Sequence, residues 1–234
     1  MQTWIRTTKW KPASPGGGSQ GFSVECSETG TLGHAKPNQF HQEVIASLLA
    51  DLVQVPVPET RLGKCEDKVL AVSKLWGGSS LDFPLLRTTS PTDASSKEMS
   101  ESLRKACGLL AFHSWINTGD LKDEHVMVAP GDQPGIYLVA SIDFASAFTW
   151  DATGGVPVLP PGPPILIADA SRDASVLDSA ISRIAGVAEA NLAPLIQSVP
   201  EVLLPDSEKK RILNGLLVRK TLIRQVFQTA GWLR

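Results

Sequence analysis

Residues 3–10 alternate in hydrophobic and polar character, and further short segments as far as residue 76 also favour strands, one of them with an apolar run at 69–72. A period of two places side chains on opposite faces of a sheet and is typical of strands. The pattern predicts strands at residues 3–10, 22–26, 32–37, 60–65 and 68–76. Residues 39–54 differ, because Val44, Leu48, Leu49 and Leu52 recur at helical spacing. This part of the sequence therefore predicts a small sheet with one helix.

A hairpin is predicted within residues 118–148. Val126, Met127 and Val128 lead into a turn at 130–135, and the chain returns as IYLVASID. Helical patterns precede the hairpin at 98–117 and follow it at 174–188, 190–197 and 206–228, so this part is predicted to be mostly helical. Asp206 is expected to cap the last helix. The basic residues of that helix are expected to form a solvated face, with a role in substrate docking left open: Arg211, Arg219, Lys220 and Arg224.

The hairpin has acidic residues at both ends, which brings Asp120, His125 and Asp143 to one end of a small sheet. Carboxylates in such a place suit metal and phosphate chemistry. Phosphoryl transfer requires a carboxylate that orients the attacking hydroxyl, metal ligands that hold the nucleotide, and a lysine on the phosphates. The sequence contains residues of these types.

Two motifs resemble those of the protein-kinase-like superfamily. GDLKDEHVMV is similar to its catalytic loop, with Asp120, Lys122 and His125 at the places of the usual Asp, Lys and Asn. SIDF is similar to the metal-binding Asp-Phe-Gly segment, with Asp143 as the Asp and Ala145 where Gly would stand. Together with the amino-terminal pattern, these motifs resemble the HipA-like kinases, which are relatives of the phosphatidylinositol kinases.

The resemblance implies an α+β, two-lobed protein-kinase-like fold. Residues 1–78 would form an N-lobe with a small β-sheet and one helix, and residues 79–234 a mostly helical C-lobe. In the N-lobe, Lys36 would hold the nucleotide phosphates and pair with Glu43 of the helix. A small-residue loop would cover the phosphates and Leu75 would border the adenine; the loop residues implied are Gly17, Gly18, Ser19 and Gln20.

The resemblance also implies roles in the C-lobe. Asp120 would orient the attacking hydroxyl, Lys122 would steady the transferred phosphate, and Asp143 would bind a metal ion that bridges the phosphates of ATP. The implied cofactors are ATP and Mg²⁺ or Mn²⁺. His125 occupies a metal-ligand place, yet Mg²⁺ prefers oxygen ligands to imidazole. With His125 at this place there are three alternatives: the site binds one metal ion instead of two, it prefers manganese, or catalysis is lost.

Three functions are therefore open. The first is an ATP-dependent kinase that phosphorylates a hydroxyl, with Ser or Thr of a protein as the expected substrate and a link to toxin–antitoxin biology implied. The second is a pseudokinase that serves as a nucleotide- or protein-binding module, and the third is a small-molecule kinase. Each residue also has an ordinary explanation: Lys36 as a surface lysine, Glu43 on the helix dipole, Asp120 as a turn cap and Asp143 as a strand end.

The composition of the chain limits its expected partners and its expected compartment. A formal net charge of −2 over 234 residues gives no basic footprint for nucleic acid, which is therefore not expected as a partner. Cys26, Cys65 and Cys107 are widely spaced, so neither a disulfide framework nor a zinc site is predicted, and a cytoplasmic protein is expected. Prolines interrupt the long weakly polar stretch at 156–164, so no membrane span is predicted. The oligomeric state is left open.

Overall fold

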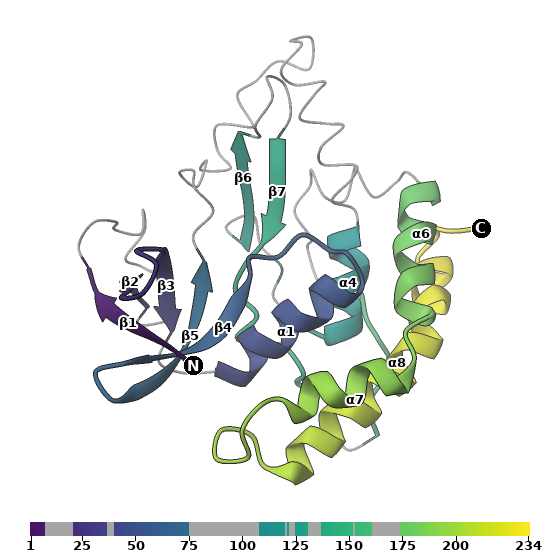
Figure 1. Cartoon of the computed structure of the whole chain (residues 1–234). Helices are drawn as coiled ribbons and strands as arrows, with labels where there is room; N and C mark the ends of the chain where they lie inside the picture. The colour runs from purple at the N-terminus through teal and green to yellow at the C-terminus, as the bar shows by residue number, and fades with distance from the viewer. Residues whose placement is uncertain are drawn as a thin grey trace.

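The computed structural model describes residues 1–7, 21–36, 40–74, 108–119, 121, 125–130, 137–151, 153–160 and 174–234. Its strands are β1 (Gln2–Arg6), β2 (Phe22–Cys26), β3 (Leu32–Lys36), β4 (Thr60–Cys65), β5 (Lys68–Lys74), β6 (Val126–Pro130) and β7 (Tyr137–Ser141). Its helices are α1 (Phe40–Leu52), α4 (Gly108–Ile116), α6 (Ala174–Ala185), α7 (Glu189–Gln197) and α8 (Asp206–Thr229). The α+β class expected from the sequence is confirmed (Figure 1).

The first five strands form a closed barrel in the order β1-β2-β3-β5-β4. The ring closes because β1 pairs antiparallel with β2 on one side and parallel with β4 on the other. The inward side chains form a hydrophobic cluster that includes Trp4. A Cβ at Gly33 would lie 3.1 Å from the Trp4 ring, and one at Gly63 would lie 2.5 Å from it. Glycine at these two positions therefore leaves room for the indole.

The turn between β4 and β5 shows why this pair is tight. Cys65 and Lys68 are register partners, so Glu66 and Asp67 make a two-residue connection, and both have positive φ, 48° and 64°. Positive φ at both central positions is the turn geometry that matches the twist of paired strands. The join predicted at these two residues is observed.

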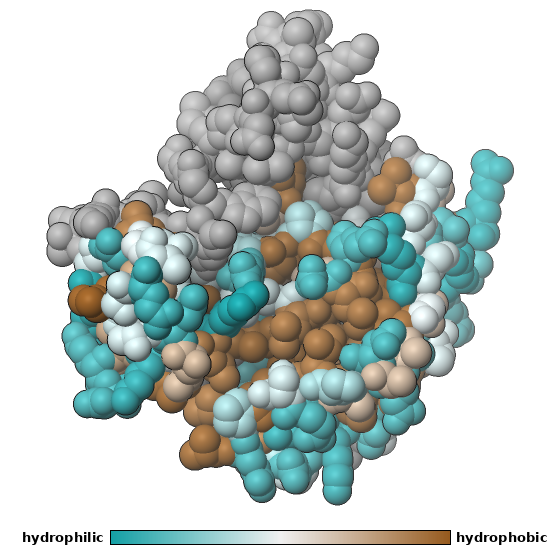
Figure 2. Space-filling view, viewed as in Figure 1, coloured by the Kyte–Doolittle hydropathy of each residue, from teal (hydrophilic) through white to brown (hydrophobic). Residues whose placement is uncertain are grey.

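A second hydrophobic cluster lies around α4 and joins α1, the β6–β7 hairpin and the C-terminal helices. Every residue of α4 is buried, and most of them are apolar, as expected for a helix that is packed on all sides. It contacts α6 and α8, whereas α1 contacts β4, β5 and α7 (Figure 1). On the face shown in Figure 2, hydrophobic residues gather along α1. The helix α1 thus links the barrel to the helical part of the chain.

Two expectations for α8 are wrong. Its N-cap is Pro205, and Asp206 is the first helical residue, so Asp206 is not the cap. Arg219 was expected on a solvated face but is only 1% exposed. Its guanidinium reaches α4, because the positions of α8 that face α4 recur every three or four residues and Arg219 is one of them.

Element ends differ from the predictions by a few residues. The predicted strand 3–10 is observed as β1, which ends at Arg6, and residues 8–10 lie outside the described residues. Helix α6 ends at Ala185, before the predicted residue 188. Within the described parts of the chain, no helix has the length and apolar character needed to cross a membrane.

Candidate active site

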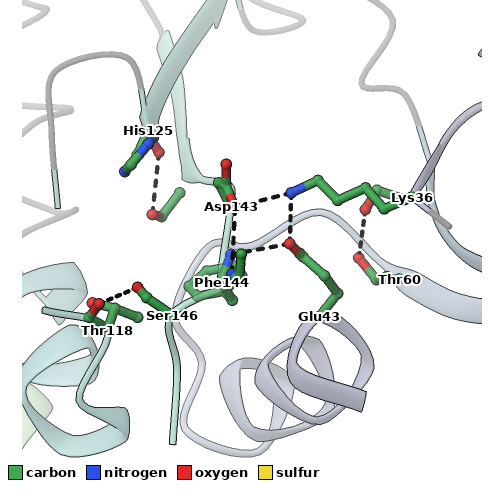
Figure 3. Close-up of polar contacts among 11 residues, drawn as sticks. Lys36, Glu43, Thr60, Thr118, His125, Asp143, Phe144 and Ser146 are labelled. Carbon is green, nitrogen blue, oxygen red and sulfur yellow. Dashed lines mark hydrogen bonds and ion pairs between the residues drawn. The ribbon is translucent and has the colours of Figure 1, made fainter. Parts of the chain in front are cut away.

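Lys36 stands at the end of β3 and points between two carboxylates (Figure 3). Its Nζ donates to Glu43 Oε1 at 2.6 Å and to Asp143 Oδ1 at 3.1 Å. Asp143 is 107 residues distant in sequence, so the barrel and the hairpin meet at this lysine. The lysine is 8% exposed, which excludes the explanation of an ordinary solvated surface lysine.

Glu43 lies in the first turn of α1 and is 3% exposed. Its Oε1 accepts from Lys36 and also from the backbone N–H of Phe144, at 3.2 Å. A Glu that served only the helix dipole would need neither contact. Glu43 therefore connects α1 to both the barrel lysine and the segment that carries Asp143.

The pKa values of Lys36, Glu43 and Asp143 are shifted by burial and by the charges of one another. Burial alone would lower the pKa of Lys36, but Glu43 and Asp143 outweigh it and the pKa is raised. Burial alone would raise the pKa of Asp143, but Lys36 outweighs it and the pKa is lowered. Burial raises the pKa of Glu43, against the attraction of Lys36. At neutral pH, Lys36 and Asp143 are therefore both charged.

Asp143 has a strained backbone, with a φ of 66°. Such a conformation costs about 1–3 kcal/mol for a residue other than glycine and is concentrated at functional sites. The N–H of Ala145 donates to Asp143 Oδ1 at 3.3 Å, so this bond and the one from Lys36 both end on Oδ1. Its side chain is 31% exposed. Among the described residues, the second oxygen, Oδ2, is thus available to a ligand.

His125 lies at the same end of the hairpin, directly before β6. Val126 and Ser141 are register partners, which places His125 beside the segment that carries Asp143. The backbone carbonyl of His125 accepts from Ile142 N at 2.8 Å and from Ser141 Oγ at 3.2 Å. The sequence pattern predicted that these two side chains share one end of the hairpin, and the structure brings them there.

The other candidate residues lie outside the described residues: Gly17, Gly18, Ser19, Gln20, Leu75, Asp120 and Lys122. The neighbours of position 120 are described. Gly119 has a φ of 62°, and Leu121 is buried in the cluster around α4. The backbone that leads to position 120 is thereby anchored.

The donor atoms near Lys36 decide which kind of metal ion the site could hold. In the described part of the chain, no three His, Cys, Asp or Glu side chains gather as a closed metal site. Mg²⁺ is commonly held by one or two carboxylates together with the phosphates of a substrate. Asp143 Oδ2, with His125 nearby, fits an ion shared with a nucleotide better than a structural metal.

One buried polar cluster was missed by the sequence prediction. His113 of α4 has both ring nitrogens 2.7 Å from hydroxyl oxygens, those of Thr118 and Ser141. Ser146 in turn donates its hydroxyl to the carbonyl of Thr118. A histidine five residues before Thr118, in a helix of otherwise mostly apolar residues, was the available signal.

Comparison by sequence finds no matching family model and no matching curated protein. Comparison by structure finds the proinflammatory kinase CtkA of Helicobacter pylori, with a TM-score of 0.61, 15% identity and 94% of each chain covered. It also finds HipA of Shewanella oneidensis MR-1, from a complex with HipB and operator DNA, at a TM-score of 0.49 and 11% identity, covering 94% of this chain and 68% of that one. The first likeness shows a shared fold.

Proposed function

We propose that the chain is an ATP-dependent kinase, because its fold is similar to that of the kinase CtkA and its motifs resemble those of the HipA-like kinases. It transfers the terminal phosphate of ATP to a hydroxyl group, that of a Ser or Thr residue in a protein substrate. The observation that carries the proposal is Lys36, held at once by Glu43 and Asp143. A buried lysine shared by a helix carboxylate and a strained aspartate is the phosphate-binding arrangement that kinases need.

In this proposal the molecule has two lobes. The barrel and α1 belong to the N-lobe of residues 1–78, and the hairpin with α4, α6, α7 and α8 belongs to the C-lobe of residues 79–234. The nucleotide lies between them, where Lys36 meets Asp143. Buried free thiols at Cys26 and Cys65 support a reducing compartment, the cytoplasm.

Each residue of the proposed site has its own role in phosphoryl transfer. A lysine ammonium has three N–H donors, of which Glu43 and Asp143 take two, so Lys36 retains one for a phosphate oxygen. Asp143 Oδ2 and His125 would hold the metal ion, which would supply positive charge to neutralise the phosphates. Asp120 accepts or orients the proton of the attacking hydroxyl, and Lys122 steadies the transferred phosphate.

The test is phosphate transfer from radiolabelled ATP to casein and to the chain itself. We expect label with the wild type and at least a 100-fold loss with Lys36→Met, Asp143→Asn and Asp120→Ala, because each removes positioning or charge stabilisation. Thr221→Val, an exposed substitution on α8, is the control and should retain full transfer. Equal labelling by wild type and Asp120→Ala would contradict the proposal.

His125 supports a second candidate, a pseudokinase that binds nucleotide or protein without transfer. An imidazole in place of an amide oxygen weakens a site for a hard cation. The variant His125→Asn separates the two candidates. For a kinase, we expect it to raise Mg²⁺-supported transfer relative to Mn²⁺-supported transfer. For a pseudokinase, ATP raises the melting temperature of the wild type while transfer is absent with either metal.

A further inference from the structure

His113 lies under the candidate active site and is 1% exposed. Its Nδ1 is 2.7 Å from Thr118 Oγ1, and its Nε2 is 2.7 Å from Ser141 Oγ. The ring also stacks on Phe144, with 5.3 Å between centroids and 28° between planes. One imidazole therefore contacts the segment before position 120 and both sides of Asp143.

The hydrogen bonds fix which ring nitrogen carries the proton. Ser141 Oγ donates to the carbonyl of His125 at 3.2 Å, since a carbonyl can only accept. The single hydroxyl proton of Ser141 is thereby used, so its oxygen must accept from His113 Nε2–H. His113 Nδ1 then accepts from the hydroxyl of Thr118. The bonds run in one direction, from Thr118 through His113 and Ser141 to His125.

The imidazole stays neutral. Burial, with a smaller contribution from His125, lowers the pKa of His113 to about 3. Within two residues of Asp120, Thr118 is also held by Ser146, whose hydroxyl donates to the Thr118 carbonyl. The helix that carries His113 is buried along its whole length. His113 is thus a fixed connector on a rigid base, and it does not exchange protons near neutral pH.

We propose that His113 is a positioning residue for phosphoryl transfer. As the Nε2–H tautomer, it sets the spacing between the segment that carries Asp120 and the segment that carries Asp143. This inference rests on the proposed function and deepens it. Among the described residues, the hydrogen bonds of His113 go to Thr118 and Ser141 and not to Lys36 or Glu43, so binding of the nucleotide depends on it less than the transfer step does.

The kinetic test uses Thr118→Val, Ser141→Ala and His113→Phe, with Thr118→Ser as the conservative partner and Thr221→Val as the surface control. Misplacement by about 1 Å can cost roughly 100-fold in rate. We expect kcat for transfer to casein to fall by about 10- to 100-fold, with KM for ATP changed by less than about 3-fold. Thr118→Ser should restore most of kcat, and combining Thr118→Val with Ser141→Ala should cost little more than either alone.

Other results would overturn the inference. A wild-type kcat in Thr118→Val, or a loss that appears only in KM, leaves His113 with a structural role alone. If His113→Phe does not fold, the Thr118 and Ser141 variants still test the inference, since they retain the imidazole of His113. If the wild type itself transfers no phosphate, the proposed function fails. If the wild type transfers phosphate and the Thr118 and Ser141 variants match it, only the positioning role of His113 fails.

Nitrogen NMR of the imidazole gives a readout independent of activity. We expect the Nε2–H tautomer for His113 and no titration between pH 7 and about pH 5, because its pKa is about 3. In Ser141→Ala the Nε2–H signal should move while the ring stays neutral. An Nδ1–H tautomer in the wild type, or titration near the ordinary pKa of about 6.5, would overturn the assignment.

Discussion

At the scale of residues, the group of Lys36, Glu43 and Asp143 joins three segments that are remote in sequence. The sequence could indicate its members because each stands in a motif or pattern: the end of a predicted strand, the first turn of a predicted helix, and SIDF. For His113 the sequence held only the sign of a histidine in a mostly apolar helix, and it could not indicate the partner Ser141, which lies 28 residues away.

Glu43→Gln tests the ion pair with little change of shape. The variant leaves the buried Lys36 with Asp143 as its remaining carboxylate, so we expect a loss of about 1–3 kcal/mol in unfolding free energy and a higher KM for ATP. The measurements are urea unfolding and transfer kinetics. Glu189→Gln is the matched control, since Glu189 is an exposed first-turn Glu of α7. If Glu43→Gln and Glu189→Gln both change the unfolding free energy and KM only slightly, Glu43 would act on the helix dipole alone.

The pKa shifts predict how stability depends on pH. The pKa of Asp143 is lowered from 3.8, so its contribution is present above that value and is lost as pH falls through the lower folded value. The pKa of Lys36 is raised from 10.5, so its contribution is present below that value and is lost as pH rises through the higher one. Urea unfolding between pH 2 and 6 should therefore show a shallower acid loss in Asp143→Asn. Parallel curves for variant and wild type would contradict this.

At the scale of elements, Arg219 joins α8 to the end of α4. Its guanidinium donates to the carbonyls of Trp115, Ser114 and Val156 at 2.7, 2.6 and 3.2 Å. Burial lowers its pKa to about 10, so it is charged at neutral pH. The sequence did contain the signal, because Arg219 interrupts the apolar stripe of Ile212, Leu216, Ile223 and Phe227.

Arg219→Met should be among the most destabilising changes on α8. It leaves the buried carbonyls at the end of α4 without their donor, and we expect a loss of about 2–4 kcal/mol by urea unfolding. Arg219→Lys should recover only part, because an ammonium lacks the planar fork. Arg224→Met is the control, since Arg224 pairs with Asp178 on the surface and such pairs contribute about 0–1 kcal/mol. A similar loss in both variants would show that the buried position does not matter.

At the scale of the whole molecule, the strands and helices were predictable from periodicity, and the chain shares its fold with the kinase CtkA, as the kinase resemblance implied. The closure of the sheet into a barrel was not predictable. It depends on Trp4 lying across Gly33 and Gly63, and alternation alone gives no sign of which strands become neighbours. The same limit applies to the meeting of α1 with the hairpin segment at Phe144, which depends on a contact over 101 residues.

A double-mutant cycle tests the closure. Gly63→Ala should cost about 1–3 kcal/mol in the wild type, because the new Cβ would lie 2.5 Å from the Trp4 ring. In a Trp4→Leu background the penalty should be smaller, since the ring that it meets is gone. Urea unfolding of the four chains gives the coupling. Strict additivity would show that Gly63 is required for another reason.

The parallel pairing of β1 with β4 also has a consequence during translation. Residues 2–6 leave the ribosome with β2 as a neighbour, but their second neighbour, at residues 60–65, emerges more than 50 residues later. Until then one side of β1 is an open strand edge, the kind of surface on which nascent chains associate. Slower translation of the stretch between the two strands should therefore increase co-translational aggregation, and a chaperone that shields the amino-terminal strand should reduce it.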